Sequence, residues 1–317
     1  MRAHEPAEFP PEVEQVYRKA VRLEWITVAY IASAATLLYL TMGSSQAMRT
    51  SFYEDVISVV PALAFLVGTR VARRSASPDF PYGRHRATSI AHLAAALALC
   101  LMGGWLLTEA AMSYFSGERA TIGGFDLFGN MVWAGWPMLA ALVYTAVPSV
   151  ILGRMKLKLA PKMHDKVLFA DARMMKADWM AESATAVGVV GTGFGLPWLD
   201  PLAAALVSAD ILKDGVGTLK TAMADLIDRR PERTDESGFE ELPREVERML
   251  RELDWVEDAR VRMRDEGHIF IGEAFVMTAP DVADLPAKLE DASARGKAMN
   301  WRVHELVVMP VTRLPDA

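Results

Sequence analysis

Long apolar runs dominate the first two-thirds of the chain. About twenty consecutive apolar residues cross a bilayer as a helix, and six stretches meet this measure. We therefore predict six transmembrane helices, at residues 25–42, 52–69, 88–112, 128–152, 171–193 and 198–219. Only Phe-Gly-Leu-Pro separates the last two, a turn-forming link that is short enough to require an antiparallel helical hairpin.

The remainder of the chain is rich in charge and has the rhythm of a small α+β domain. The pattern predicts an αββαβ order, as in ferredoxin-like folds, with two helices on one face of a three-stranded sheet. The predicted elements are helix 240–253, strands 256–263 and 269–277, helix 285–297 and strand 301–309. The chain thus divides into an N-terminal segment (1–22), a six-helix membrane domain (23–229), a linker (230–238) and the αββαβ domain (239–317).

Composition agrees with a membrane protein that carries a soluble domain. The chain is 52% hydrophobic and 23% charged. Its net charge of −6 does not indicate the basic surface that binds nucleic acid. The single cysteine, Cys100, excludes a disulfide within the chain and a cysteine-cluster metal site. The first twenty residues are polar and lack the apolar core of a signal peptide, so we expect no cleaved leader.

Basic residues predict the orientation in the membrane, because they concentrate in cytoplasmic loops. Those between spans two and three, and between spans four and five, are Arg70, Arg73, Arg74, Arg84, Arg86, Arg154, Lys156, Lys158, Lys162 and Lys166. The opposite loops hold little more than Arg49 and Arg119. We expect a multi-pass protein of the cell membrane with both termini and the αββαβ domain in the cytoplasm.

We single out four of the acids inside the predicted helices: Glu54, Asp55, Asp178 and Glu182. A carboxylate in hydrocarbon costs several kcal/mol, so an acid at this depth usually faces a protein-lined or aqueous cavity and marks an ion or proton path. These positions therefore predict ion transport. We find no pair of nucleophile and base and no phosphate-binding loop, so we do not expect an enzyme, and we expect no cofactor.

Four segments together resemble the cation diffusion facilitators, a family of dimeric antiporters that export divalent transition metals against protons. They are GSSQAMRTSFYEDVIS, FPYGRHRATSIAHLAAAL, ADARMMKADWMAES and DPLAAALVSADILKDGVGTLKTAMADLIDRRP. The resemblance covers nearly the whole chain. It implies a homodimer whose partners are a divalent cation, protons and the lipid bilayer.

The resemblance also implies a four-ligand site, with two residues spaced i and i+4 on each of the second and fifth helices. The matching positions are Ser51 with Asp55, and Met174 with Asp178. Because only the second of each pair is an acid, a further donor must come from elsewhere. We expect Asp55 and Asp178 to form the ligand core.

Glu54 is our expected third oxygen donor, and Glu182 follows Asp178 by one helical turn. Alternatively, Glu54 or Glu182 pairs with Lys176 or Arg49 at a helix end. We interpret Met174 primarily as a packing residue and secondarily as a soft sulfur donor to a metal.

One histidine position and one loop bear on the choice of metal. His92 lies in the third span, where a lone histidine is more often a packing residue than a ligand. In the loop after the second span, Phe80 and Arg84 stand where the resemblance would place ligands. A site made of carboxylates favours manganese, ferrous iron or magnesium, and zinc remains possible.

In the αββαβ domain, Glu257 and Glu273 fall at positions resembling family metal ligands, and His268 and His304 are expected at the surface or at a strand edge. The domain is therefore expected to hold the dimer together, with weak metal sensing or none. The whole chain is predicted to be a proton-coupled exporter of manganese, ferrous iron or zinc. The alternative is a transport-impaired paralogue that serves as the structural or regulatory partner of an active exporter.

Overall fold

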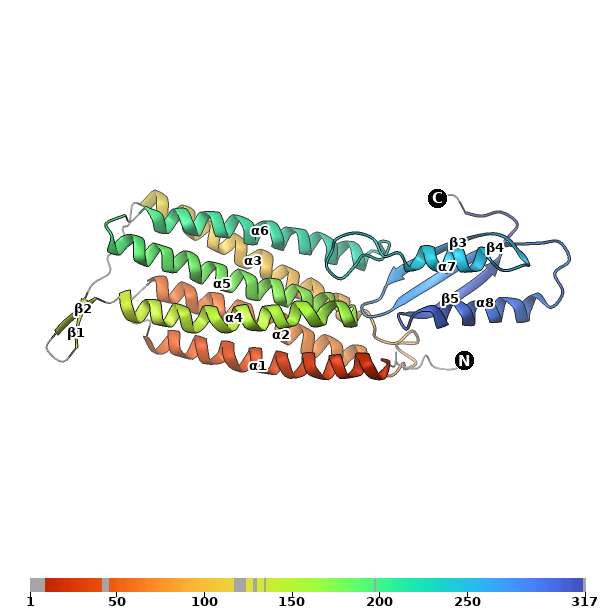
Figure 1. Cartoon of the computed structure of the whole chain (residues 1–317), viewed down its shortest axis with the longest axis horizontal. Coiled ribbons are helices and arrows are strands. Elements are labelled where there is room, and N and C mark those ends of the chain that lie inside the picture. The colour runs from red at the N-terminus through yellow and green to blue at the C-terminus, as the bar shows by residue number, and fades with distance from the viewer. Residues whose placement is uncertain are drawn as a thin grey trace.

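The computed structural model describes residues 9–41, 46–116, 124–127, 130–133, 135–196 and 198–315. Six long helices lie side by side, and a small domain containing a sheet stands at one end of them (Figure 1). The helices are α1 (Pro11–Thr41), α2 (Gln46–Ala72), α3 (Ala87–Ser116), α4 (Gly135–Met163), α5 (Lys166–Gly193) and α6 (Leu199–Leu226). Among the described residues, α1 to α4 have the length and apolar character needed to cross a membrane. Charged side chains interrupt the apolar runs of α5 and α6.

The predicted start of the fourth span is wrong. Strands β1 (Gly124–Leu127) and β2 (Asn130–Trp133) form an antiparallel hairpin where a helix from residue 128 was expected. Helix α4 begins only at Gly135, with Pro137 in its first turn, where a missing N–H costs no helical hydrogen bond. The hairpin lies at the end of the bundle opposite the αββαβ domain (Figure 1).

The expected loop of basic residues between spans four and five is also wrong. Helix α4 runs on to Met163 and α5 begins at Lys166, so Arg154, Lys156, Lys158 and Lys162 are helical. His164 ends α4 with a left-handed backbone (φ 50). Asp165 caps α5, since its carboxylate accepts a hydrogen bond from Leu168 N at 2.8 Å. The connection is therefore a tight turn rather than a loop.

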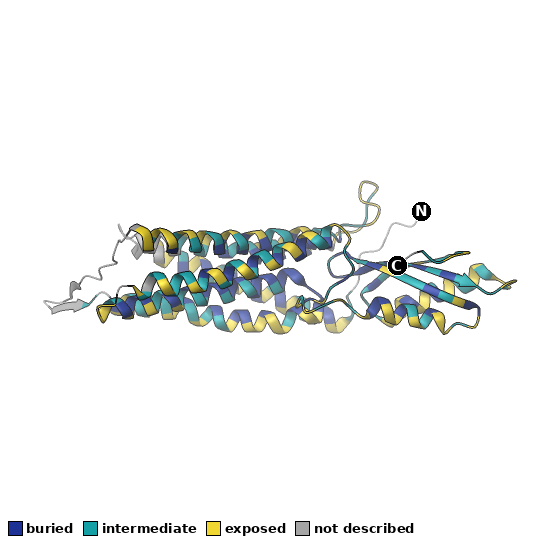
Figure 2. Ribbon diagram, turned by 90° about the horizontal axis from the view of Figure 1, so that it is seen from above, coloured by how far each residue is buried: buried dark blue, intermediate teal, exposed yellow. Residues whose placement is uncertain are grey.

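Small residues bring α3 and α6 close together, as small residues in membrane helices commonly do. A Cβ atom built on Gly103 would come within 2.6 Å of the backbone of Leu212, and one on Gly215 within 2.7 Å of the Cα atom of Cys100. Exposed residues follow the outer faces of the helices (Figure 2), and many are large and apolar, including Trp25, Leu101, Val143 and Ile151. Such faces suit contact with lipid.

The αββαβ order of the C-terminal domain is confirmed. Helix α7 (Leu242–Arg251) precedes β3 (Val256–Asp265) and β4 (Phe270–Thr278), and helix α8 (Leu285–Met299) precedes β5 (Val303–Pro310). The sheet order is β3-β4-β5, with β3 antiparallel and β5 parallel to β4. Val246 and Leu250 of α7, Ala292 of α8 and Ala274 of β4 share one apolar core, which holds both helices to the sheet.

Candidate metal-transport site and domain junction

Asp178 of α5 faces α2 in the middle of the membrane domain. Only 9% of its surface is exposed, and Ser58 Oγ donates a hydrogen bond to Asp178 Oδ1 at 2.6 Å. Asp55 lies three residues before Ser58, on the same face of α2, and acts electrostatically on Asp178. The structure therefore brings together the two acids that the sequence placed at the core of the site.

Glu54 and Glu109 form a second group of acids next to this pair. Glu54 interacts electrostatically with Glu109 of α3 as well as with Asp55. Sequence reasoning missed Glu109, although the signal was the same one that identified the other four: an acid inside the apolar run Trp-Leu-Leu-Thr-Glu-Ala-Ala-Met. The chain thus carries five acids, from three helices, in one region of the bundle.

Glu182 has a polar neighbour on α4. It lies within hydrogen-bonding reach of Thr145, and the Tyr30 hydroxyl lies 3.2 Å from Ser149 Oγ in the same group. The Tyr30 hydroxyl also donates to the carbonyl oxygen of Thr145. Glu182 still interacts electrostatically with Asp178 and Asp55, so it borders the acidic region from the α4 side.

Met174 is fully buried in an apolar cluster with Leu99, Met102 and Ile211. It therefore reads as a packing residue in this conformation. Ser51 lies in α2, and its side chain falls outside the part of the structure that is described.

Lys176 does not pair with Glu54 or Glu182, contrary to one alternative. Its Nζ lies 3.0 Å from a carboxylate oxygen of Asp210 and 3.0 Å from one of Asp214, both on α6. Lys176 therefore does not neutralise the acids of α2 and α5. Within the described residues, no three His, Cys, Asp or Glu side chains are arranged to hold a metal ion as they stand.

A buried cluster of charge lies between this region and the C-terminal domain. Lys156 of α4 has no exposed surface, and its Nζ contacts Glu24 Oε2 of α1 at 3.0 Å and Asp171 Oδ2 of α5. Both acids are also wholly buried. Lys156, expected in a cytoplasmic loop, instead ties three helices together.

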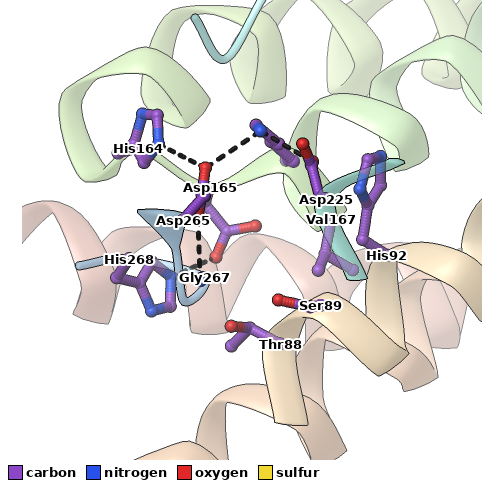
Figure 3. A pocket seen from close by; sticks show the side chains of 11 residues that line it. Thr88, Ser89, His92, His164, Asp165, Val167, Asp225, Asp265, Gly267 and His268 are labelled. Atoms are coloured by element: carbon purple, nitrogen blue, oxygen red, sulfur yellow. Dashed lines mark hydrogen bonds and ion pairs between the residues drawn. The ribbon is translucent and has the colours of Figure 1, made fainter. Parts of the chain in front are cut away.

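The turn between α4 and α5 meets the turn between β3 and β4 at the junction of the two domains (Figure 3). Nε2 of His268 lies 2.6 Å from Asp165 Oδ2, and Nε2 of His164 lies 3.0 Å from Asp265 Oδ2. His268 is 7% exposed, so the expectation that it lies at the surface is wrong. His268 is buried because it contacts a residue of the other domain, and the sequence around His268 gives no sign of that contact.

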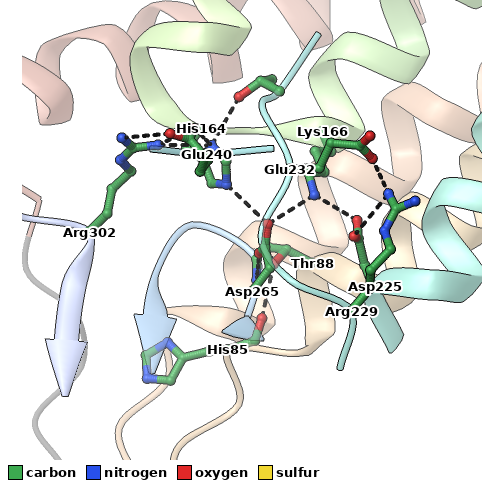
Figure 4. A network of polar contacts seen from close by, with 12 residues as sticks. His85, Thr88, His164, Lys166, Asp225, Arg229, Glu232, Glu240, Asp265 and Arg302 are labelled. Atoms are coloured by element: carbon green, nitrogen blue, oxygen red, sulfur yellow. Dashed lines mark hydrogen bonds and ion pairs between the residues drawn. The ribbon is translucent and has the colours of Figure 1, made fainter. Parts of the chain in front are cut away.

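Lys166 is the central cation of this junction (Figure 4). Its Nζ lies 2.7 Å from Asp225 at the end of α6 and 2.9 Å from Asp265. Burial opposes ionisation of Asp265, but Lys166 and His164 outweigh it and hold the pKa of this carboxyl well below its usual range. The Asp265 carboxylate therefore stays ionised wherever the domains are docked.

The linker also packs against the membrane domain. Thr234 Oγ1 lies 3.1 Å from His164 Nδ1, and Arg173 of α5 donates to Glu236 at 2.6 Å. Arg302, at the start of the last strand, donates to Glu240 at 2.6 Å (Figure 4). Residues 230–238 thus form a bound segment of the junction rather than a free spacer.

His92 lines a small buried cavity, of about 10 Å³, at this junction together with Ser89, Asp225 and Gly267 (Figure 3). It is 2% exposed, and its Nε2 has no hydrogen-bond partner among the described residues. The cavity has room for one water molecule. His92 stands apart from the acids of α2 and α5.

The secondary positions offer little to a metal. The Arg84 guanidinium lies 4.3 Å above the centre of the Phe80 ring, in a cation–π contact. Glu273 accepts from Arg262, its partner across the sheet, while Glu257 lies five residues before Arg262 on β3, roughly 16 Å away along the strand. Glu257 and Glu273 therefore do not share one site within this chain.

Sequence comparisons agree with the geometry. The model of the cation efflux transmembrane domain matches residues 25–227. The manganese efflux system protein MneS of Bacillus subtilis is 27% identical over 203 residues, which are 64% of this chain and 66% of MneS. MneP, a manganese efflux system protein of the same organism, is 24% identical over 265 residues, 81% of this chain and 82% of MneP. The magnetosome protein MamM of Paramagnetospirillum magneticum is 23% identical over 59% of this chain and 56% of its own length.

Proposed function

Because the chain belongs to the cation efflux family, we propose that it is an antiporter that exports a divalent transition-metal cation from the cytoplasm in exchange for protons. The observation that carries the proposal is the Asp55–Asp178 pair, two acids from facing helices inside an apolar bundle, with Ser58 binding one of them. An acid pair of this kind can take up either a divalent cation or protons.

Exchange follows from competition for the same oxygens. A metal ion needs deprotonated carboxylates, and protons neutralise those carboxylates and remove the ligands. When the site opens to the cytoplasm, Asp55 and Asp178 bind the metal, with Glu54 as a third donor. When it opens outward, protons displace the ion. Glu109 and Glu182 border the pair and add negative charge that attracts a cation.

A change of conformation is part of this proposal. In the structure, Asp178 is engaged by Ser58 and Met174 is packed among apolar side chains. A complete ligand shell therefore requires α2 and α5 to shift relative to each other. Alternating access requires such a shift of helices around a fixed site.

The donor chemistry favours manganese or ferrous iron, with zinc possible. The acidic region offers carboxylates and a serine hydroxyl, whereas His92, the histidine of α3, lies at the domain junction instead. Carboxylate oxygens suit harder ions. The names of MneS and MneP as manganese efflux proteins support the same choice, although the chain aligns with only 66% of the length of MneS.

We further propose that all six long helices cross the membrane, that both ends of the chain face the cytoplasm and that the protein is a homodimer. Helix α1 begins, and α6 ends, at the side of the C-terminal domain (Figure 1). The intervening acids of α5 would then face the bundle interior, where polar groups in membrane helices belong.

Metal-dependent proton flux in proteoliposomes tests the function. We expect wild-type protein to carry manganese at least as well as zinc. Asp55→Asn or Asp178→Asn should lower flux beyond the roughly 10–100-fold that loss of an outer-shell partner costs, since each removes an anionic ligand at nearly equal volume. Asp210→Asn is the matched control, because Lys176 keeps its partner Asp214.

Two results would contradict the proposal. Wild-type flux in both acid variants, with an intact fold by size-exclusion chromatography, would place the site elsewhere. Absence of flux for every metal in a folded wild-type protein would favour the alternative, a transport-impaired paralogue. The observation that favours this alternative is the burial of Met174 in an apolar cluster at a position where a ligand is expected.

A further inference from the structure

We propose that Glu24, Lys156 and Asp171 form a second proton-binding site, separate from the metal-binding acids, where one proton is held by the two carboxyl groups and exchanged during transport. This inference rests on the proposed antiport function and adds to it. Nothing in the role of Asp55 and Asp178 requires a second site. The geometry of the three side chains carries the argument.

The first step is burial. Glu24, Lys156 and Asp171 come from three different helices, and none of them has any exposed surface. Lys156 Nζ donates to Glu24 Oε2 at 3.0 Å and to Asp171 Oδ2. Water is therefore not available to solvate these carboxyl and ammonium groups. An uncompensated charge in such surroundings would cost several kcal/mol.

The second step is charge balance. Two carboxylates and one ammonium carry a net charge of −1, so a single additional proton makes the cluster neutral. The strongest electrostatic partners of Glu24 and of Lys156 all lie within the cluster. Asp178, further along α5, interacts electrostatically with Asp171 and, as an acid, adds negative charge instead of compensating it.

The third step is the position of the unused oxygens. Glu24 Oε1 and Asp171 Oδ1 are buried and have no hydrogen-bond partner among the described residues. The Glu24 and Asp171 carboxyl groups act directly on each other. Two carboxylates that share a site cannot both ionise freely, and one proton between them supplies the missing donor.

The fourth step connects the cluster to transport. Asp171 and Asp178 lie two turns apart on α5, about 10 Å along the helix axis. A shift of α5 that changes the contacts of Asp178 with α2 also moves Asp171 relative to Glu24 on α1 and Lys156 on α4. When Asp171 separates, the Glu24 carboxylate alone neutralises Lys156, so the shared proton is released to water. When the three side chains meet again, the cluster takes up one proton from water and becomes neutral.

Infrared spectroscopy of the reconstituted full-length protein without metal reads the proton directly. The wild type should show the carbonyl stretch of a protonated carboxyl that is absent in Glu24→Gln, where Lys156 and Asp171 already balance each other. Asp171→Asn should lose the same band by the converse change. Lys156→Met should gain a second protonated carboxyl, because both acids then lack a cation.

The proton-to-metal ratio of transport is the second readout. We expect this ratio to fall by one in Glu24→Gln. Asp178→Asn serves as the control: it should lose metal flux yet keep the infrared band assigned to Glu24 and Asp171. An unchanged infrared band or an unchanged proton-to-metal ratio in folded Glu24→Gln protein overturns this inference and does not affect the proposed metal site. Full metal flux in Asp178→Asn refutes the proposed metal site, and the infrared result can still be interpreted.

Discussion

Asp178 and Lys166 represent two ways in which this chain buries a charge. Lys166 is neutralised at once by Asp225 and Asp265, which contact its ammonium at 2.7 and 2.9 Å. Asp178 has only the Ser58 hydroxyl as a hydrogen-bonding partner among the described residues, and other acids surround it. The paired charge of Lys166 stabilises a junction. The negative charge around Asp178 favours binding of a cation.

Gly267 tests the junction at the scale of one residue. Its φ of +86° favours glycine, and a Cβ atom there would lie 1.8 Å from Thr88 Oγ1. We expect Gly267→Ala to undock the C-terminal domain, measured as faster proteolysis within residues 229–241. Gly195→Ala is the matched control, since it has a similar φ of +79° with open space around it, and should cost only about 1–2 kcal/mol of strain.

The added variant Thr88→Ala separates the two effects at Gly267. It removes the hydroxyl oxygen that the new Cβ would strike, so it should partly restore protection against proteolysis in the double variant. Equal proteolysis rates for Gly267→Ala and wild type would show that the β3–β4 turn does not dock against α3 in solution.

Two turns define the junction at the scale of elements. The α4–α5 turn presents His164, Asp165 and Lys166, and the β3–β4 turn presents Asp265 and His268. The Lys166–Asp265 ion pair and the two His–Asp contacts cross between the turns and hold the junction. Helix α5 begins at this turn and also carries Asp178, so one helix connects the junction to the acidic region.

Asp265→Asn tests this electrostatic docking. The pKa of Asp265 is depressed, so its contribution is present above the ordinary aspartate pKa of about 4 and is lost as pH falls through the lower folded-state value. The contribution of the Asp265 carboxylate to docking should therefore stay constant between about pH 5 and 7 and weaken only in stronger acid.

Asp265→Asn should lose about 3 kcal/mol of docking free energy already at neutral pH, because a buried ion pair is broken. Hydrogen exchange at the β3–β4 turn measures this loss. Asp258→Asn, on the same strand, is the matched control: its pair with Arg251 is exposed and should contribute less than about 1 kcal/mol. Equal exchange in the two variants would contradict the docking role of Asp265.

The C-terminal domain contacts the membrane domain at this junction and has an apolar core of its own. Its candidate metal ligands are weak, since Arg262 already neutralises Glu273 and Glu257 lies elsewhere on the sheet. We infer that the domain supports assembly and positions α5 without sensing metal tightly.

The double variant Glu257→Gln with Glu273→Gln tests this view. We expect its flux to depend on metal concentration as the wild type's does, within about twofold, because two separated surface acids make only a weak divalent site. Flux assays across a metal titration measure this, and calorimetry of the full-length protein checks binding. A large shift in the metal concentration that gives half-maximal flux would mean that the domain is a sensor.

The sequence by itself determined the elements whose signal is local. Apolar length predicted the bundle, period and turn residues predicted αββαβ, and the acids at Asp55 and Asp178 marked the region where the structure brings them together. These features can be predicted from the sequence because each depends on a residue and its close neighbours along the chain. The same rule applied to Glu109 would have identified the fifth acid.

Tertiary structure alone decided which charges meet. Lys156 looked like a loop cation and proved to be buried against Glu24, 132 positions away in the chain. His268 looked like a surface residue and proved to be bound to Asp165, 103 positions away. Burial of a charge depends on a partner that arrives from another element, and neither helical period nor local composition carries information about that partner.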